Sequence, residues 1–262
     1  MLRFSEENFM KKLFFAVACA ISAFIFSGCT VDMALRDSDL TVKELESKMS
    51  SALDPQGRFA SAERFIQRFE VKTSTGLMEP PQEEFVEVKF ARPGSFKITT
   101  SDDKGLDYGY IFNDAGGFMI NYRKKSVKPL DKELLSHLRT MREIADPVME
   151  LGTVFNHIEI KRGTVSGKDF YLLRCRKNPA DNPLEFFISA RDYRLKRLNG
   201  KLKIGSATID YSSTVVNYVL NEGMMVADLT KSVTNGIKTE SKLVGFKLNP
   251  RFAPDEFKIP VF

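Results

Sequence analysis

The sequence has no tryptophan and, among its 262 residues, only two histidines and three cysteines. Because most metal sites and many acid–base mechanisms use histidine, this scarcity counts against a metalloenzyme and against histidine-based catalysis. Three cysteines cannot build the disulfide framework of a small secreted domain. With 16 glycines and 11 prolines, the chain is neither collagen-like nor of low complexity. These absences favour a folded protein that is not an enzyme.

Common catalytic and cofactor-binding motifs are also missing. The sequence contains no H-E-x-x-H, G-x-S-x-G, Walker or G-x-G-x-x-G pattern. His137, His157 and Cys175 lie within periodic segments, where such residues are more typical of structure than of catalysis. Two carboxylates converging across a cleft, as in glycosidases, would be visible only in three dimensions. We therefore predict no enzyme activity, no cofactor and no metal site.

The residues that are abundant describe an ordinary folded protein, with 43% apolar and 28% charged side chains. The length allows one large domain or two small ones. The net charge of +5 is spread over 39 basic and 34 acidic residues, too diffusely to indicate a nucleic-acid partner. The densest basic run, 123–128, is either a solvated strand end or a contact with anionic lipid headgroups.

The first 29 residues have the features of a bacterial lipoprotein signal. The pair Lys11-Lys12 precedes an uncharged apolar run over 13–28, which is shorter than the ~20 residues that a membrane span needs. This run leads into Phe26-Ser27-Gly28-Cys29, which resembles the lipobox, where the cysteine is diacylated and becomes the first mature residue. We therefore expect a signal peptide over 1–28 and an acyl anchor on Cys29.

Three neighbouring positions bear on this expectation. Phe26 stands where the lipobox usually has leucine, so a plain secretory signal and an uncleaved anchor remain alternatives. Met10 is an alternative start residue. In enterobacterial lipoproteins an aspartate after the cysteine retains the protein at the inner membrane, whereas this chain has Thr30. We accordingly expect a lipid-anchored protein of the cell envelope, at the outer membrane and facing the periplasm.

The remaining chain is expected to form a short linker and one domain. Residues 29–40 are polar and without a clear period, as in a linker from the anchor. Thr41 and Glu44 form a T-x-x-E capping box, and apolar residues at helical spacing then predict a helix over 42–53. Because no composition shift divides residues 41–262, we expect a single domain there.

From residue 65 onwards the apolar residues alternate with polar ones, as in strands that have one buried face. A second amphipathic helix begins after Asp131 and ends at Asp146-Pro147. The predicted strands, about a dozen, are 65–75, 84–91, 96–100, 108–112, 118–122, 155–162, 168–176, 184–191, 193–198, 202–211, 215–221, 224–233 and 237–248. We therefore predict an α+β, mostly β fold, in which one strongly curved antiparallel sheet, a half-open barrel, has helices covering its concave face.

Three segments are similar to the lipoprotein-carrier superfamily of LolA and LolB. Residues 89–98 (KFARPGSFKI) resemble a turn between adjacent strands of that family, residues 192–197 resemble a later turn, and residues 248–260 resemble its closing strand. The resemblance covers 41–260. It implies a curved sheet of about eleven strands with a helical lid that holds acyl chains. Since the family's shuttles are free in the periplasm, an anchored member is expected to be a membrane-bound acceptor or lipid-binding factor.

On this basis we expect lipid, or the acyl chains of lipoproteins, to bind in a nonpolar cavity between sheet and lid. The expected wall and lid residues are Val88, Phe90, Phe96, Ile98, Tyr110, Phe112, Ile120, Tyr122, Leu134, Leu138 and Met141. A shift of one residue in register would invert these faces. The alternative is a structural or regulatory module with a filled core, which docks another envelope protein through a sheet edge or through the basic run.

Overall fold

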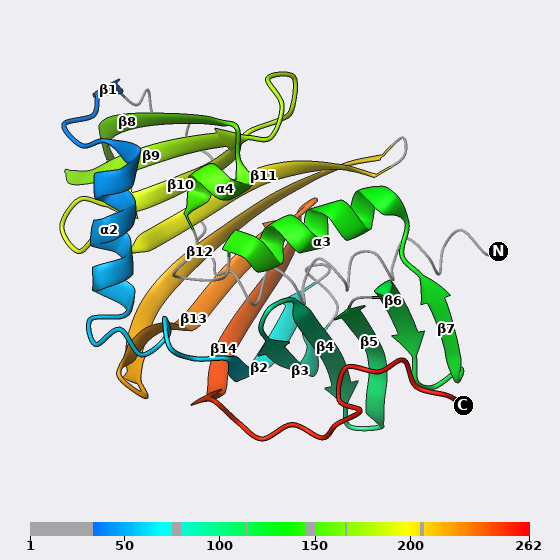
Figure 1. The fold of residues 1–262 in the computed structure, drawn as a ribbon. Coiled ribbons are helices and arrows are strands. Elements are labelled where there is room, and N and C mark those ends of the chain that lie inside the picture. Colours follow the sequence, from blue (N-terminus) through cyan, green and yellow to red (C-terminus); the bar gives the residue numbers. More distant parts are fainter. Residues whose placement is uncertain (1–33, 75–79, 114, 145–149, 166, 205–206) are drawn as a thin grey trace.

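The computed structural model describes residues 34–74, 80–113, 115–144, 150–165, 167–204 and 207–262 (Figure 1). The expected signal peptide and Cys29 lie outside these residues. The helices are α2 (Val42–Leu53), α3 (Lys132–Ile144) and α4 (Leu151–Val154). The strands are β1 (Arg36–Asp37), β2 (Arg64–Ser74), β3 (Gln82–Ala91), β4 (Ser95–Asp102), β5 (Gly105–Asn113), β6 (Gly116–Asn121), β7 (Ser126–Pro129), β8 (His157–Val165), β9 (Lys168–Arg176), β10 (Leu184–Ser189), β11 (Leu195–Ile204), β12 (Ala207–Asn221), β13 (Met224–Thr234) and β14 (Ile237–Leu248).

All fourteen described strands belong to one antiparallel sheet, in the order β1-β8-β9-β10-β11-β12-β13-β14-β2-β3-β4-β5-β6-β7. Strands β2 to β7 form one meander and β8 to β14 form another. The two meanders join where β14 pairs with β2, with Leu248 opposite Phe65 and Lys238 opposite Ser74. The sheet is not closed, because β1 and β7 form its two ends. The predicted mostly β, antiparallel architecture is confirmed.

The expected strand count of about eleven is too low, and two of the additional strands are short. β1 lies within the segment expected to be a linker, and it pairs with β8 through Arg36 opposite Arg162 and Asp37 opposite Lys161. Asp39 extends this contact, because Arg162 Nη1 donates to its carboxylate at 2.7 Å. The other short strand, β7, follows the turn after β6. Two-residue and four-residue strands carry too little alternation to be recognised in a sequence.

The predicted strand breaks near Gly200 and Ser213 are wrong, because β11 and β12 run through both positions. Gly200 lies opposite Tyr211, and a Cβ atom at Gly200 would come within 2.4 Å of the Tyr211 ring. The glycine therefore makes room for an aromatic ring within the sheet instead of marking a turn. Farther along β12, a bulge between Val215 and Asn217 absorbs the change in alternation.

Local capping residues set the helix starts. Thr41 and Glu44 form the predicted capping box, in which the Glu44 amide donates to Thr41 Oγ1 and the Glu44 carboxylate accepts from the Thr41 amide at 2.8 Å. The resulting helix, α2, has the predicted bounds. Asp131 caps α3 in a similar way, because its carboxylate accepts from the Leu134 amide at 2.8 Å. No helix among the described residues is both long and apolar enough to cross a membrane.

The helices and one face of the sheet share a contiguous hydrophobic core. Leu45 of α2, Leu134 and Leu138 of α3 and Leu151 of α4 all belong to it and are at most 7% exposed. The other members come from strands of both meanders, from Phe65 on β2 to Phe246 on β14. We refer to this side of the sheet as the core face and to the opposite side as the outer face.

Helix α3 contacts both meanders. At one meander, Arg142 Nη1 donates to the Gly94 carbonyl at 3.0 Å, and Leu135 packs against Gly117 so closely that a Cβ there would lie 2.5 Å from Leu135 Cδ1. At the other meander, the His137 ring lies 5.9 Å from the ring of Tyr211 on β12. Six strands separate β6 from β12 in the sheet order, so the sheet must curve for both to reach one helix.

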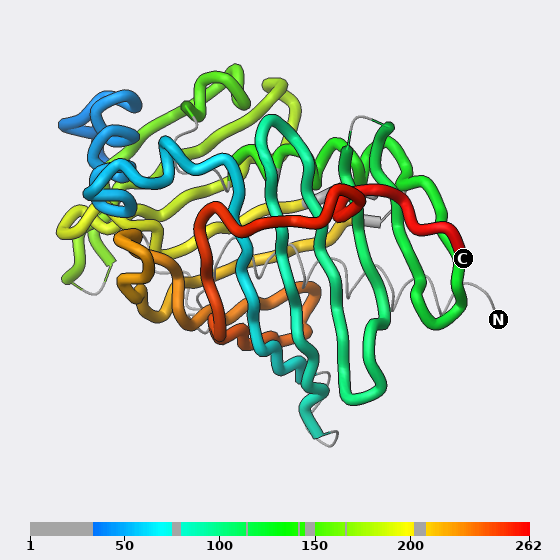
Figure 2. Tube along the Cα trace, turned by 60° about the horizontal axis from the view of Figure 1, so that its bottom comes forward, coloured from blue at the N-terminus to red at the C-terminus, as the bar shows by residue number. Residues whose placement is uncertain are grey.

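The C-terminal tail, residues 249–262, crosses the outer face of β3 to β6 (Figure 2). Glu256 fixes it there, because its carboxylate accepts from Lys89 Nζ at 2.9 Å and from Lys97 Nζ at 2.8 Å. Asn113 Nδ2 also donates to the Phe257 carbonyl at 2.8 Å. Burial raises the pKa of Glu256, but the hydrogen bonds from Lys97 and Lys89 outweigh that effect and leave the pKa below its usual range.

Replacing Glu256 with glutamine is expected to lower the free energy of unfolding by about 1–3 kcal/mol, because Lys97 loses the carboxylate that it contacts and Lys89 keeps only Glu87. Urea unfolding measures this change. The matched control is Asp255→Asn, since Asp255 is exposed on the same tail. Equal stability of the Glu256→Gln variant and the control would contradict the assigned role of Glu256.

Candidate functional site

Six of the expected wall residues form two rows across β3, β4 and β5 on the core face. Val88 pairs with Ile98 and Ile98 with Tyr110, while Phe90 pairs with Phe96 and Phe96 with Phe112. All six are at most 6% exposed and belong to the same core cluster as the lid leucines Leu134 and Leu138. Their expected role in ligand binding stays a prediction. They lie on one face and pack beneath α3.

Ile120 and Tyr122 do not share this face, which corrects the expected set. The hairpin between β5 and β6 pairs Asn113 with Gly116, so Tyr110 lies opposite Met119 and Ile120 lies opposite Gly109. Side chains alternate along a strand, and Ile120 therefore points to the outer face. It is fully buried there, on the side that the C-terminal tail crosses.

The outer-face position of Tyr122 is marked by its contact with the tail, since its ring lies 6.3 Å from that of Phe262. Met119 takes the place on the core face that was expected for Ile120. The side chain of Met141, and Cys29, lie outside the part of the chain that the structure describes in atomic detail.

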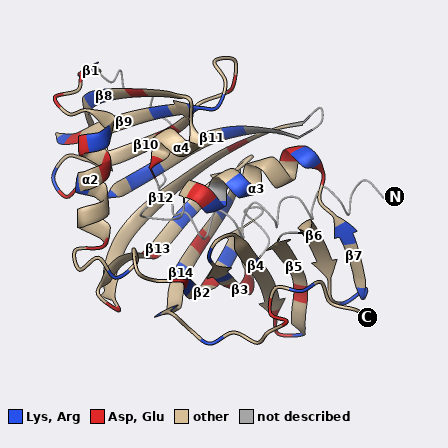
Figure 3. Ribbon diagram, viewed as in Figure 1, with Lys and Arg blue, Asp and Glu red and all other residues tan. Residues whose placement is uncertain are grey.

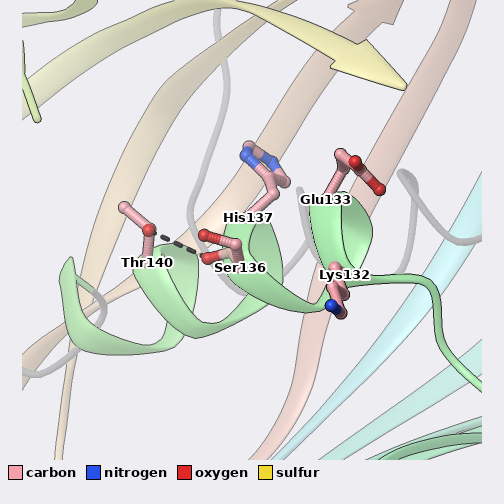
Figure 4. A pocket seen from close by; sticks show the side chains of 5 residues that line it. All are labelled: Lys132, Glu133, Ser136, His137 and Thr140. Atoms are coloured by element: carbon pink, nitrogen blue, oxygen red, sulfur yellow. Dashed lines mark hydrogen bonds between the residues drawn. The ribbon is translucent and has the colours of Figure 1, made fainter. Parts of the chain in front are cut away.

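Described residues line several open pockets, of which three bear on the site. One of about 400 Å³ lies along α3 and is lined by Lys132, Glu133, Ser136, His137 and Thr140 (Figure 4). A groove of about 580 Å³ runs over β10 to β13, and a pocket of about 410 Å³ lies between the C-terminal tail and the ends of β4 and β5. None of these three is lined by the expected apolar wall residues, which pack against one another instead.

His137 is a mostly buried histidine in the α3 cavity, where it shares one side of the helix with Glu133 (Figure 4). Burial lowers its pKa to about 4, and repulsion from Lys177 adds to the effect. The imidazole is therefore neutral at pH 7. The uncharged His137 ring contacts the ring of Tyr211 and so links α3 to the second meander.

Two kinds of site, a cysteine nucleophile and a metal-binding group, find no support among the described residues. Burial raises the pKa of the Cys175 thiol to about 12, so the thiolate needed by a nucleophile is scarce at pH 7. No group of three or more His, Cys, Asp or Glu side chains in the described ranges could hold a metal ion.

The basic run 123–128 divides into one paired residue and several exposed ones. Arg123 donates to Asp102 at 2.6 Å and lies 3.3 Å from Asp107. Lys124, Lys125 and Lys128 are exposed at the turn and edge formed by β6 and β7. Elsewhere the two signs of charge alternate over strands and helices (Figure 3). The three lysines thus remain available to an anionic surface.

Sequence reasoning missed a group of buried hydroxyl side chains on β12, β13 and β14. We call this group the hydroxyl patch; its members are Ser213, Thr230, Ser232, Thr234, Thr239 and Ser241. The available signal was serine or threonine at every second position, as in residues 230–234 (TKSVT). The pairing of these strands places the alternating hydroxyl residues on the core face.

The pKa of His137 predicts a pH-dependent stability. Because the native pKa of about 4 is below the ordinary value of 6.5, the unfolded chain binds more protons between these values. The free energy of unfolding should therefore fall by about 1–3 kcal/mol from pH 6.5 to pH 4 through this residue. Urea unfolding across this range should show a weaker pH dependence for His137→Gln. His157→Gln, which changes an exposed histidine, should retain the wild-type dependence.

No protein-family model matches this sequence, and no curated protein sequence matches it either. Comparison with solved structures does give matches. A LolA superfamily protein from Nitrosomonas europaea superposes with a TM-score of 0.59 and 11% identity, over 84% of this chain and 98% of that chain. An outer membrane lipoprotein-sorting protein domain, described as putative, from Vibrio parahaemolyticus gives 0.51 and 13%, over 81% and 97%.

A DUF1329 family protein from Desulfovibrio piger also matches, with a TM-score of 0.53 and 9% identity, over 83% of this chain and 97% of that chain. All these identities are low, so the likeness concerns the fold. It spans both meanders and nearly the whole of each solved chain. The open, curved antiparallel sheet of this protein is a LolA-like fold.

Proposed function

We propose that this protein is a membrane-anchored envelope lipoprotein that binds lipid, or the acyl chains of lipoproteins, between α3 and the core face. In this proposal residues 1–28 are a signal peptide, acylated Cys29 holds the protein at the outer membrane, and 41–262 form the binding domain in the periplasm. The observation that carries it is α3 itself. This helix contacts both meanders of a LolA-like sheet, and its Leu134 and Leu138 belong to the same hydrophobic core as the apolar wall.

Binding would be a partition of acyl chains and would not require bond chemistry. The wall residues are buried against one another and against α3, so the lid must move before a chain can enter. Exposing two leucines costs roughly 3–6 kcal/mol. A dozen methylenes leaving water gain about 10 kcal/mol. The gain exceeds the cost, and the balance stays small enough for exchange with a membrane.

The short strand β1 supports a defined orientation at the membrane. Only residues 30–35 separate Cys29 from β1, and a segment of that length spans at most about 21 Å. Ion pairs of Asp37 with Lys161 and of Asp39 with Arg162 hold this part of the chain to β8. The β1 edge of the sheet would therefore face the bilayer closely.

A second candidate function is favoured by the tight packing of the expected wall. Phe65 stacks on Phe90 with ring centroids 4.9 Å apart, and Phe96 lies 5.9 Å from Phe112. A core that stays filled would leave a structural or regulatory module. Such a module would dock an envelope protein through the β7 edge or through Lys124 and Lys125.

Mass spectrometry of the protein purified in a nonionic detergent tests the first function. The intact mass should correspond to a chain that begins at acylated Cys29, and an organic extract should contain further, noncovalent lipid. Leu138→Gln, which places an amide among the apolar side chains, should reduce that lipid about tenfold, since a buried amide without a partner costs roughly 1–3 kcal/mol. Arg139→Gln is the matched control on the exposed side of α3.

Circular dichroism and thermal unfolding would establish that both variants fold. Equal amounts of lipid with the Leu138→Gln and Arg139→Gln variants would indicate adventitious lipid and contradict the proposal. A protein partner retained in the absence of lipid would favour the second function.

A further inference from the structure

The hydroxyl patch lies in the middle of the core face, where the two meanders meet. Ser213 pairs with Ser232 and Ser232 with Thr239, while Thr230 pairs with Ser241. Thr234 lies opposite Tyr211. All six serine and threonine members are at most 3% exposed. This area is therefore both buried and polar, in contrast to the apolar rows of β3 to β5.

Half of these hydroxyl groups lack a protein partner. Ser213 and Ser232 share a hydrogen bond with their oxygens 3.3 Å apart. The Oγ1 atoms of Thr230, Thr234 and Thr239 are buried and make no hydrogen bond. A buried hydroxyl without a partner lowers the stability of the fold. Three such hydroxyl groups lie on one face of two adjacent strands. We infer that they form hydrogen bonds with a bound molecule and not with the protein itself.

The surroundings define what such hydroxyl groups could bind. The patch is continuous with apolar residues, because Ser241 lies opposite Val71 and Ser213 lies opposite Leu198. No lysine or arginine occurs in these paired rows of the core face. A phosphate or carboxylate would call for such a cation. The patch is suited to an uncharged hydrogen-bond acceptor that is attached to apolar chains.

The α3 cavity lies next to this patch. His137, which lines the cavity, contacts the ring of Tyr211, and Tyr211 lies directly opposite Thr234. The neutral imidazole places no positive charge at this point. A ligand that displaces α3 would therefore meet the patch between the two arms of the sheet.

We propose that the hydroxyl groups of Thr230, Thr234 and Thr239, spread over β13 and β14, provide alternative hydrogen-bond donors to the ester carbonyl oxygens of a bound diacyl lipid. The acyl chains then contact the apolar rows, and the headgroup lies away from the patch. This inference rests on the proposed lipid-binding function and adds the part of the lipid that the protein recognises. It predicts a preference for ester-linked over ether-linked chains, because an ether-linked lipid has no carbonyl acceptor.

Native mass spectrometry of the purified full gene product tests this preference. The probes are diacyl phosphatidylglycerol and its dialkyl analogue with chains of equal length. The wild-type protein should bind the diacyl lipid about tenfold more tightly, as unpaired buried donors penalise the analogue. Thr230→Val/Thr234→Val/Thr239→Val, which retains the side-chain shape, should bind both lipids equally.

Thr214→Val is the matched control for this variant. Thr214 also has a buried Oγ1 without a partner, but it lies opposite Arg197 and Lys231 on the outer face. Its replacement should leave the ester preference unchanged. Equal binding of both lipids by the wild-type protein, or a preference that survives in the triple variant, would overturn the inference and leave lipid binding itself intact.

Stability gives a second, independent measurement. Without ligand, the triple variant should unfold at a higher urea concentration than the wild type, because it removes three unpaired buried hydroxyl groups. A lower midpoint would mean that the hydroxyl groups serve the fold, and would contradict the proposal. Failure of the wild-type protein to bind either lipid would instead overturn the proposed function, and this inference with it.

Discussion

The packing of α3 against both meanders is the interaction on which the arrangement of this molecule depends. Leu134 and Leu138 enter the core, while Arg142 and His137 reach opposite arms of the sheet. An antiparallel sheet of fourteen strands accumulates twist, and a helix that touches both arms determines how far it curls. In the proposed function, the same contacts make α3 the element that must move before a ligand can reach the core face.

The two faces of the sheet are stabilised by different means. On the core face, apolar side chains and helices exclude water. The outer face, where Ile111 and Ile120 are buried, is the side that the C-terminal tail crosses, and a carboxylate shared by two lysines fixes the tail in place. Both faces of β5 are therefore buried, which gives this part of the sheet little freedom to deform. The hydroxyl patch on β12 to β14 is the exception, because there polar groups are buried without partners.

Local signals in the sequence were sufficient for much of this fold. The capping box at Thr41 determines where α2 begins, and strict alternation along residues 84–91 is enough to predict β3 and its buried face. The face of the sheet on which a side chain lies could not be predicted where it depends on the register of a turn. The β5–β6 hairpin pairs Asn113 with Gly116, and this single register moves Ile120 and Tyr122 to the outer face. The contacts of the C-terminal tail and the position of the hydroxyl patch depend on residues that are far apart in the chain. No local sequence pattern predicts them.

The pairing of β14 with β2 has a consequence for how the chain folds. These strands lie near opposite ends of the described sequence, yet their ladder joins the two meanders. The β2 edge of the first meander has no partner until β14, the last strand, has been synthesised, and contacts of such large sequence separation form slowly. Until then the edges of both halves are open to pairing with other chains. The β2 edge is therefore exposed for as long as β14 is missing, so this topology favours formation of the sheet after the C-terminal strand is available.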